Sequence, residues 1–427
     1  MKKSPTKLYY GWWILGGAVL AQFVATSAGQ MASGVFLTPV VEELNIQVWQ
    51  FAAAVSVASA IGGIVVVIIG PAIDQIGPRR IMLVGTLFCS LGLLGLSLQS
   101  TLWHFVALQI VSSALGWTLF GPLVINATLT KWFIARRGWA LALGSVGVSL
   151  AGLITPITLT AAVDGHGWRT GYLILALGVA VIVAPVALLM HRQPEDLGLL
   201  PDGAKLLSNI EADDKQIAQA ITTDDLQTHT RSQAIKTKSF WLVSLGYGLN
   251  AAALSSVLLH AIPYATSVGF ERSLAAVGLG VNGLGNLSSK VIWGWALQRV
   301  DARKLAATAF STSATGVLLM IAAGAMQNTA MLMAGFFLYG FGFGGTIPIS
   351  EFLWARYFGR RHIGAIRGIG RPITIIFSTG GPIAAGAWFD ITGSYVNAFL
   401  VIACVYFIGA VIINLSKVPP PNVNSSA

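Results

Sequence analysis

The sequence predicts an all-α integral membrane protein with twelve transmembrane helices in two similar halves. Three observations lead to this fold class. Of the 427 residues, 55% are hydrophobic and only 10% are charged, and the mean hydropathy is +0.73. Soluble domains carry about 25% charged residues, so this chain has too few charges to cover a water-exposed surface of its size. Apolar runs of transmembrane length and an internal repeat are the other two observations.

The charge distribution indicates membrane orientation. Lys and Arg outnumber Asp and Glu by 26 to 16, which gives a formal net charge of +10. The basic residues form short clusters between apolar runs and no stripe with exposed aromatic residues, so we expect no nucleic-acid partner. Basic clusters beside membrane helices instead set the orientation of those helices. Cys89 and Cys404 fall inside apolar runs, where helix packing is their expected role.

The apolar runs have about the 20 residues that a helix needs to cross hydrocarbon. The first run continues to Val40, which is longer than the apolar core of a signal peptide, so we interpret it as the first transmembrane helix. The twelve predicted helices are Gly11–Val40, Trp49–Ala72, Ile81–Leu98, Leu102–Phe133, Trp139–Val163, Tyr172–Met190, Phe240–Val268, Leu274–Leu297, Leu305–Met326, Met331–Trp354, Ile363–Trp388 and Val396–Leu415.

One long polar stretch, Arg192–Lys238, separates the two sets of six helices. It is acidic at Glu211–Lys215 and Thr222–Asp225 and poor in aromatic residues, which is typical of a linker. The predicted organisation is an N-terminal six-helix bundle at 1–190, a cytoplasmic linker at 191–238, a C-terminal six-helix bundle at 239–418 and a cytoplasmic tail at 419–427.

The loops give the orientation. Only Arg169 and Arg272 lie in loops on one side of the membrane, and all other loop clusters of basic residues lie on the opposite side. The positive-inside rule therefore predicts a multi-pass protein of the cell inner (plasma) membrane with both termini in the cytoplasm, and we expect a monomer. The residues that define the basic side are Lys2, Lys3, Lys7, Arg79, Arg80, Lys131, Arg136, Arg137, Arg299, Arg303, Lys304, Arg356, Arg360, Arg361 and Lys417.

An internal repeat supports the two halves. The segment from Gly70 to Arg80, with Asp74, Gly77 and Arg79 at fixed spacing, follows the second helix. The segment Gly294–Lys304 follows the eighth helix at a constant sequence offset. Glycines allow a tight turn between two helices, and an aspartate there can sit at a helix N-terminus or pair with a cation. Such repeats place a substrate site near the bilayer midplane, where the halves meet.

On these residues the chain resembles the major facilitator superfamily, whose fold is two six-helix bundles related by a pseudo-twofold axis. In the second copy Gln298 replaces the acid and Asp301 replaces the second glycine. The resemblance implies a gating motif. The predicted motif and gating residues are Gly70, Asp74, Gly77, Arg79, Arg80, Glu351 and Arg356, with Glu351 in a gating or structural ion pair.

Finer features are similar to the monocarboxylate and oxalate:formate antiporter branch of that superfamily. They are Tyr10–Trp13, Gly167–Tyr172, Pro194–Gly198, Gly381-Pro382 and Asp390–Tyr395. In that branch a cation of the eighth helix binds the substrate carboxylate, and the matching position here is Lys290 in place of the usual Arg. Asn286 stands where the proton-coupled carriers of this branch have Asp. At this position the chain resembles the exchanger-like members more. A coupling proton on His260 or Glu351 stays an open alternative.

Charges inside the hydrocarbon zone are costly and suggest function. Lys290 and Arg371 lie roughly 10 and 12 Å from the cytoplasmic ends of their helices, so the two cations share a depth and suggest an anion site. The alternatives are structural: Lys290 pairs with a helix carbonyl or with Glu351, and Arg367 extends to the interface. The predicted substrate-binding residues are Lys290, Arg371, Asn286, Asn282, Asn250, His260, Tyr247, Gln22 and Gln30.

The resemblance and these cations together imply a secondary active or facilitative transporter of a small organic anion, a mono- or dicarboxylate, that works by rocker-switch alternating access. The alternative is an efflux carrier for a drug or another hydrophobic solute. We expect no enzyme and no cofactor, because the sequence has no cluster of nucleophile, base or metal ligands and no Walker loop.

Overall fold

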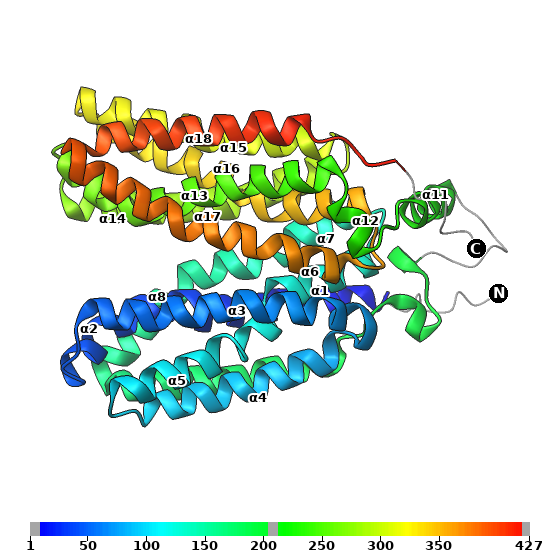
Figure 1. Cartoon of the computed structure of the whole chain (residues 1–427), viewed down its shortest axis with the longest axis horizontal. Coiled ribbons are helices and arrows are strands. Elements are labelled where there is room, and N and C mark those ends of the chain that lie inside the picture. Colours follow the sequence, from blue (N-terminus) through cyan, green and yellow to red (C-terminus); the bar gives the residue numbers. More distant parts are fainter. Residues whose placement is uncertain (1–8, 204–211, 421–427) are drawn as a thin grey trace, which may run out of the picture. The chain divides into compact units, whose positions relative to one another are not determined.

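The computed structural model describes residues 9–203 and 212–420. Within these ranges the secondary structure is helical and includes no β-strand (Figure 1). The all-α prediction is therefore confirmed. Lys2, Lys3 and Lys7 of the predicted N-terminal cluster, Glu211 of the predicted acidic linker and residues 421–427 of the predicted tail lie outside the described ranges.

The first six membrane segments are mostly built from two shorter helices. Their pieces are joined by π-helical turns at Ser27–Met31 and Val179–Val183 and by a 3-10 turn at Trp117–Leu119. The bounds are α1 (Gly11–Thr26) with α2 (Ala32–Glu43), α3 (Val48–Ile76), α4 (Pro78–Ser97), α5 (Leu102–Ser113) with α6 (Pro122–Trp132), α7 (Arg137–Gly144) with α8 (Val146–His166), and α9 (Trp168–Gly178) with α10 (Ala184–Leu189).

The last six segments are single long helices. They are α13 (Lys238–Ser267), α14 (Arg272–Ala296), α15 (Ala302–Met326), α16 (Thr329–Phe358), α17 (Ile363–Thr392) and α18 (Tyr395–Leu415). The polar stretch between the two sets holds the helices α11 (Ala212–Leu226) and α12 (Arg231–Ile235) and 3-10 turns at Pro194–Leu197 and Pro201–Gly203.

In the described part of the chain, 10 helical segments are both long and apolar enough to cross a membrane. α14 and α17, with 25 and 30 residues, are equally long but less apolar. The reason is local, because α14 carries Lys290 and α17 carries Arg367, Arg371 and two prolines. With these two helices the structure has the twelve predicted segments.

Special backbone positions end these helices. Gly77 separates α3 from α4 with φ +82°, and Gly167 separates α8 from α9 with φ +83°. A residue with a side chain is strained in this left-handed region, so glycine permits the chain to turn at each of these positions. Pro78 suits the first helical position of α4, which follows Gly77. Asp301 begins α15 by accepting a hydrogen bond from the Arg303 amide, so the helix starts before the predicted Leu305.

The chain divides into two compact units. The first unit combines the chain up to His229 with Phe358–Gly368, and the second holds Thr230–Tyr357 and Ile369–Pro420. The start of α17 thus packs with the first unit. The predicted domain boundaries near 190, 238 and 418 stay predictions.

Candidate functional site

α14 has one apolar and one polar face. Val277 and Leu284, seven residues apart, are 58% and 54% exposed. On another face Asn282, Asn286 and Lys290, at intervals of four residues, are only 6%, 7% and 2% exposed. An apolar exterior and a polar interior are what hydrocarbon solvent requires of a membrane helix. Three of the residues predicted for substrate binding therefore share one buried helix face.

Lys290 reaches across to α16. Its Nζ donates a hydrogen bond of 2.8 Å to the carbonyl oxygen of Gly344, which is the helix-carbonyl contact of the structural alternative. The two helices approach closely because α16 has glycines at this contact: a Cβ on Gly344 would collide with Ser289 Oγ, and one on Gly340 would collide with the Asn282 carbonyl. Small residues spaced in this way let membrane helices pack backbone against backbone. The close approach is what brings a carbonyl within reach of the buried ammonium group.

The ammonium group of Lys290 has no ion-pair partner in the described part of the chain. Among the residues that the structure describes, no carboxylate lies within the 4.0 Å of Nζ that would make an ion pair. An ammonium group has three N–H donors, and the Gly344 carbonyl takes one of them. Buried charges are normally paired, so this arrangement is suited to binding an anion.

α13 contributes two further predicted residues. Tyr247 and Asn250 lie three residues apart, so they share a helix face, and both are buried. The Tyr247 ring stands edge-on to Phe310, with ring centroids 5.2 Å apart. In the described part of the chain, the buried Asn250 Oδ1 and Asn282 Oδ1 have no hydrogen-bond partner. Such groups are available to a ligand or to water.

The other predicted binding residues are dispersed. His260 lies about 15 Å further along α13 than Asn250, and its Nε2 is 3.1 Å from the Pro382 carbonyl oxygen, which fits a packing histidine. Arg371 is half-buried on α17. In the first unit, Gln22 donates to Asn126 Oδ1 at 3.1 Å, and Gln30 is exposed. Their roles in binding stay predictions.

The two predicted gating residues of α16 differ in environment. Glu351 is buried at 7% exposure, and Arg356, near the end of the helix, is exposed. Five residues separate them, which places their side chains on different sides of α16. Within the described ranges Arg356 makes no ion pair with Glu351.

Asp74 makes both of the interactions that its motif suggests. Its carboxylate forms an ion pair of 2.7 Å with Lys131, and both side chains are almost fully buried. It also accepts hydrogen bonds from the amides of Gly364 at 3.3 Å and Ala365 at 2.9 Å. These amides open α17, where the helix dipole favours a negative charge. Asp74 therefore joins the α3–α4 turn to the start of α17 within the first unit.

A second aspartate, Asp224 of α11, connects the two basic loops. It pairs with Arg137 at 2.7 Å and with the Nε of Arg360 at 3.7 Å, and it accepts the Arg360 amide at 3.2 Å. Arg360 also contacts Glu195 at 2.5 Å and the Lys131 carbonyl at 3.1 Å. The side chains of Asp224, Arg137 and Arg360 are at most 9% exposed. Linker acids thus neutralise the arginines that follow α6 and α16.

A third aspartate, Asp202, occupies a nest of backbone amides. It accepts the three consecutive amides of residues 134–136 at 2.8, 2.8 and 3.0 Å. The Tyr9 hydroxyl donates to the Trp132 carbonyl beside it, at 3.0 Å. Burial, with the nearby carboxylates of Asp202 and Glu195, raises the pKa of Tyr9 above its ordinary value. The hydroxyl is thereby held in its protonated, donating form.

Sequence reasoning missed the roles of Asp224, Asp202 and Glu195. Their signals were present, because the first two belong to the polar linker and Glu195 to the Pro194–Gly198 motif. An acidic linker can be solvated or docked, however, and composition does not distinguish these states. Only the docking partners make these residues recognisable.

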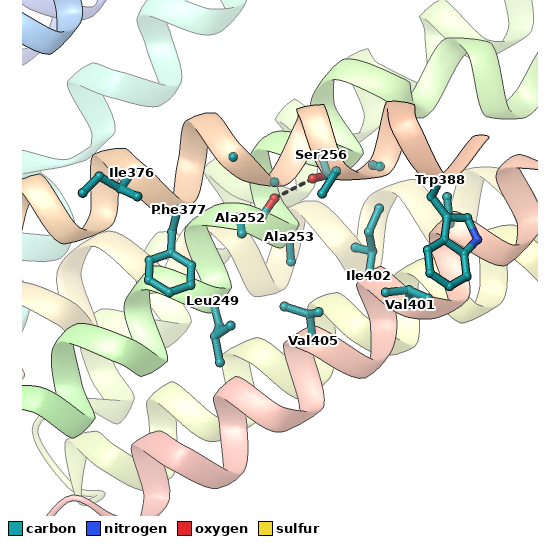
Figure 2. A pocket seen from close by; sticks show the side chains of 15 residues that line it. Leu249, Ala252, Ala253, Ser256, Ile376, Phe377, Trp388, Val401, Ile402 and Val405 are labelled. Atoms are coloured by element: carbon teal, nitrogen blue, oxygen red, sulfur yellow. Dashed lines mark hydrogen bonds between the residues drawn. The ribbon is translucent and has the colours of Figure 1, made fainter. Parts of the chain in front are cut away.

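An apolar cavity of about 400 Å³ lies between α13, α17 and α18 (Figure 2). Leu249, Phe377, Trp388 and Val405 line it, together with further aliphatic residues and small residues. The hydroxyl of Ser256 is already used, because it donates to the Ala252 carbonyl at 2.7 Å. None of the lining residues is charged, so the cavity suits an apolar group, and none of the predicted binding residues lines it.

The chain matches known proteins along most of its length. The family model of the Major Facilitator Superfamily matches residues 18–283 and 239–427. Monocarboxylate transporter 13 of Rattus norvegicus is 25% identical over 78% of this chain and 72% of its own. The oxalate:formate antiporter of Oxalobacter formigenes is 23% identical over 63% of this chain and 60% of its own. The fujikurins efflux protein of Gibberella fujikuroi is 37% identical, but the match spans 26% of this chain and 25% of that protein.

The fold is also similar to that of solved membrane transporters. The solved proton:xylose symporter XylE superposes with a TM-score of 0.74 at 13% identity and covers 96% of both chains. At this identity the likeness shows the fold alone. The family model covers well over half of the chain, however, and the helical segments have the lengths that a lipid bilayer requires. The chain therefore belongs to the major facilitator superfamily and is a multi-pass membrane transporter of small molecules.

Proposed function

We propose that this transporter carries a small organic anion, a mono- or dicarboxylate, and that Lys290 neutralises the substrate's charge. One observation carries the proposal: Lys290 is 2% exposed and is not paired with a carboxylate in the described part of the chain. A carboxylate would take the two N–H donors that the Gly344 carbonyl leaves, and Asn282 and Asn286 on the same face would contact the rest of a small polar solute.

The relatives support this substrate class. Two of them are named for monocarboxylates and for oxalate and formate. Lysine retains the charge but gives up the planar fork with which arginine binds a carboxylate through two parallel hydrogen bonds. We therefore expect this carrier to tolerate several carboxylate geometries rather than to select one sharply.

The test is uptake of radiolabelled lactate and oxalate into proteoliposomes. Lys290→Gln removes the charge at similar length, and we expect uptake to fall at least thirtyfold, because breaking a buried charge pair costs about 2–5 kcal/mol. Lys290→Arg should retain uptake. Lys236→Gln, which removes an exposed lysine, is the matched control.

A purely structural role of Lys290 has a different signature. If the ammonium only ties α14 to α16, Lys290→Gln will lower the melting temperature, and lactate or oxalate will not stabilise the wild-type protein. Unchanged uptake by a folded Lys290→Gln protein would refute the role of Lys290 in binding an anionic substrate.

We also propose that the motif residues around Asp74 act in gating at the cytoplasmic end, that both termini lie on that side of the plasma membrane, and that the carrier is a monomer. Protease access to a terminal tag in oriented vesicles tests the orientation, and light scattering of the purified protein tests the monomer. Uptake at two pH values with an internal pH dye separates proton coupling from exchange.

A second candidate is export of a hydrophobic solute. The apolar cavity beside α17 favours it, as does the similarity to a fungal efflux protein. Under this alternative, filling the cavity with Ala385→Leu will abolish transport of an apolar dye, and lactate uptake will be absent from the wild type. If the anion proposal holds, the same substitution leaves lactate uptake intact.

A further inference from the structure

A polar cavity of about 430 Å³ lies at the turn between α3 and α4, away from Lys290. Gln75–Arg80 line one side, and Met190–Arg192 with Asp196 line the other. All of these residues belong to the first unit. Neither the proposed anion site nor the apolar cavity includes any of them.

The lining carries a net positive charge. Arg192 forms a two-pronged ion pair with Asp196, at 2.9 and 3.3 Å, and donates to the Gln75 carbonyl at 3.3 Å, so its charge is neutralised and its position fixed. Arg79 and Arg80 are exposed, and they form no ion pair within the described ranges. Two cations at the edge of a cavity therefore lack a counter-ion among the residues that the structure describes.

The repeated motif in the second half differs at the first of these two cations. Arg303, at the position equivalent to Arg79, is held by Asp301 at 3.2 Å and by the Ser416 carbonyl at 3.2 Å. Asp301 stands where the first copy has Gly77. Within the described ranges the first copy thus leaves Arg79 unpaired, and its α4 N-terminus, which no aspartate caps, has a dipole that also favours an anion.

An apolar stripe continues from the cavity along α4. Leu87 and Leu91 are 57% and 52% exposed and lie one turn apart, and Leu188 of α10 is 48% exposed. Between the polar cavity and this apolar stripe, the Tyr10 hydroxyl donates a hydrogen bond to the backbone carbonyl of Leu189 at 2.9 Å. Aromatic residues with a polar tip are typical of the level of the lipid headgroups.

We propose that this cavity binds the phosphate of an anionic phospholipid, with Arg79 and Arg80 as its ligands and the acyl chains along the α4 stripe. Arginine binds phosphate oxygens through paired, charge-assisted hydrogen bonds. Basic pockets at the cytoplasmic ends of membrane helices are suited to such headgroups. A free phosphate would bind the arginines equally well, but it would make no contact with the apolar stripe. The stripe therefore favours a phospholipid.

The experiment is native mass spectrometry of the purified full-length chain with phosphatidylglycerol or phosphatidylcholine, and a thermal-shift arm with inorganic phosphate. The double variant Arg79→Gln/Arg80→Gln should lose phosphatidylglycerol affinity about thirtyfold, because it loses the charge-assisted hydrogen bonds of two arginines to the phosphate, each of which contributes about fivefold. The control Arg303→Gln/Lys304→Gln removes two charges at the equivalent positions of the second half and should change affinity less than twofold. Arg79→Lys/Arg80→Lys should retain most of the binding.

The outcomes separate the possible sources of the anion. Loss confined to the Arg79/Arg80 variant and to phosphatidylglycerol supports the proposal. Equal loss in the control variant would mean general surface attraction and would overturn it. Stabilisation by inorganic phosphate alone, as large as that by phosphatidylglycerol, would replace the lipid with a soluble anion. Unchanged binding in a folded Arg79/Arg80 variant would refute the site.

Discussion

Replacing Asp224 with Asn tests whether the linker is a structural part of the transporter. The substitution preserves shape but removes the charge that faces Arg137 at 2.7 Å and Arg360 at 3.7 Å, in a cluster at most 9% exposed. Removing one partner of a buried ion pair costs about 3–5 kcal/mol. The asparagine oxygen can still accept a hydrogen bond, which offsets about 1 kcal/mol. We therefore expect a loss of about 2–4 kcal/mol in the stability of the first unit.

The neighbouring residue provides the control. Asp225 pairs with Arg361 at 3.4 Å, but these side chains are 36% and 59% exposed, and exposed pairs contribute about 0–1 kcal/mol. Thermal unfolding of the purified proteins, followed by tryptophan fluorescence, should show a melting temperature lower by roughly 5–10 °C for Asp224→Asn and by about 1 °C for Asp225→Asn. Equal melting temperatures for the two variants would refute the claim that α11 is docked through Asp224.

Three further outcomes are expected. Gly344→Ala should destabilise the second unit by about 1–3 kcal/mol, because the new Cβ collides with Ser289 Oγ, whereas Gly280→Ala on α14 meets no atom within 4 Å and should be near neutral in the same thermal assay. Asp202→Asn should lower the melting temperature, since three amides lose a charged acceptor at a net cost of about 2 kcal/mol. Tyr9 has a raised pKa, so its contribution to stability is complete below the unfolded value of 10.0 and declines as the pH rises above it; Tyr9→Phe should flatten that decline, and an unchanged slope would contradict the assignment.

Much of the fold was predictable because lipid imposes simple rules on a sequence. Length and apolarity located the twelve segments, and Gly77 and Asp74 could be assigned from their chemistry to a tight turn and to a helix N-terminus with a cation. Lys290 could be singled out because an intramembrane charge is costly wherever it lies. Each of these inferences depends on one residue and its solvent.

Other features depend on partners that are distant in sequence. Nothing local distinguishes Asp224, which bridges two arginines, from Asp225 beside it, whose side chain is 36% exposed. The π-helical turn at Ser27–Met31 also lacks a specific local signal, because a glycine in a membrane helix does not by itself predict a change of hydrogen-bond register. The cavity near Arg79 could not be predicted either, because it forms between the α3–α4 turn and the end of α10, which are distant in sequence.

The hydrogen bond from Lys290 to the Gly344 carbonyl has a consequence for turnover. A carrier must release its substrate, and an ammonium group left without a partner in an apolar interior would raise the free energy of the substrate-free state. For the proposed carboxylate substrate, the Gly344 carbonyl keeps one N–H of Lys290 satisfied at 2.8 Å, so a departing anion leaves behind an ammonium group that still has a partner. The carbonyl also leaves only two N–H donors for an arriving carboxylate and so limits how tightly that substrate can be held. We therefore expect modest affinity with fast release, a balance set by two glycines one turn apart on α16.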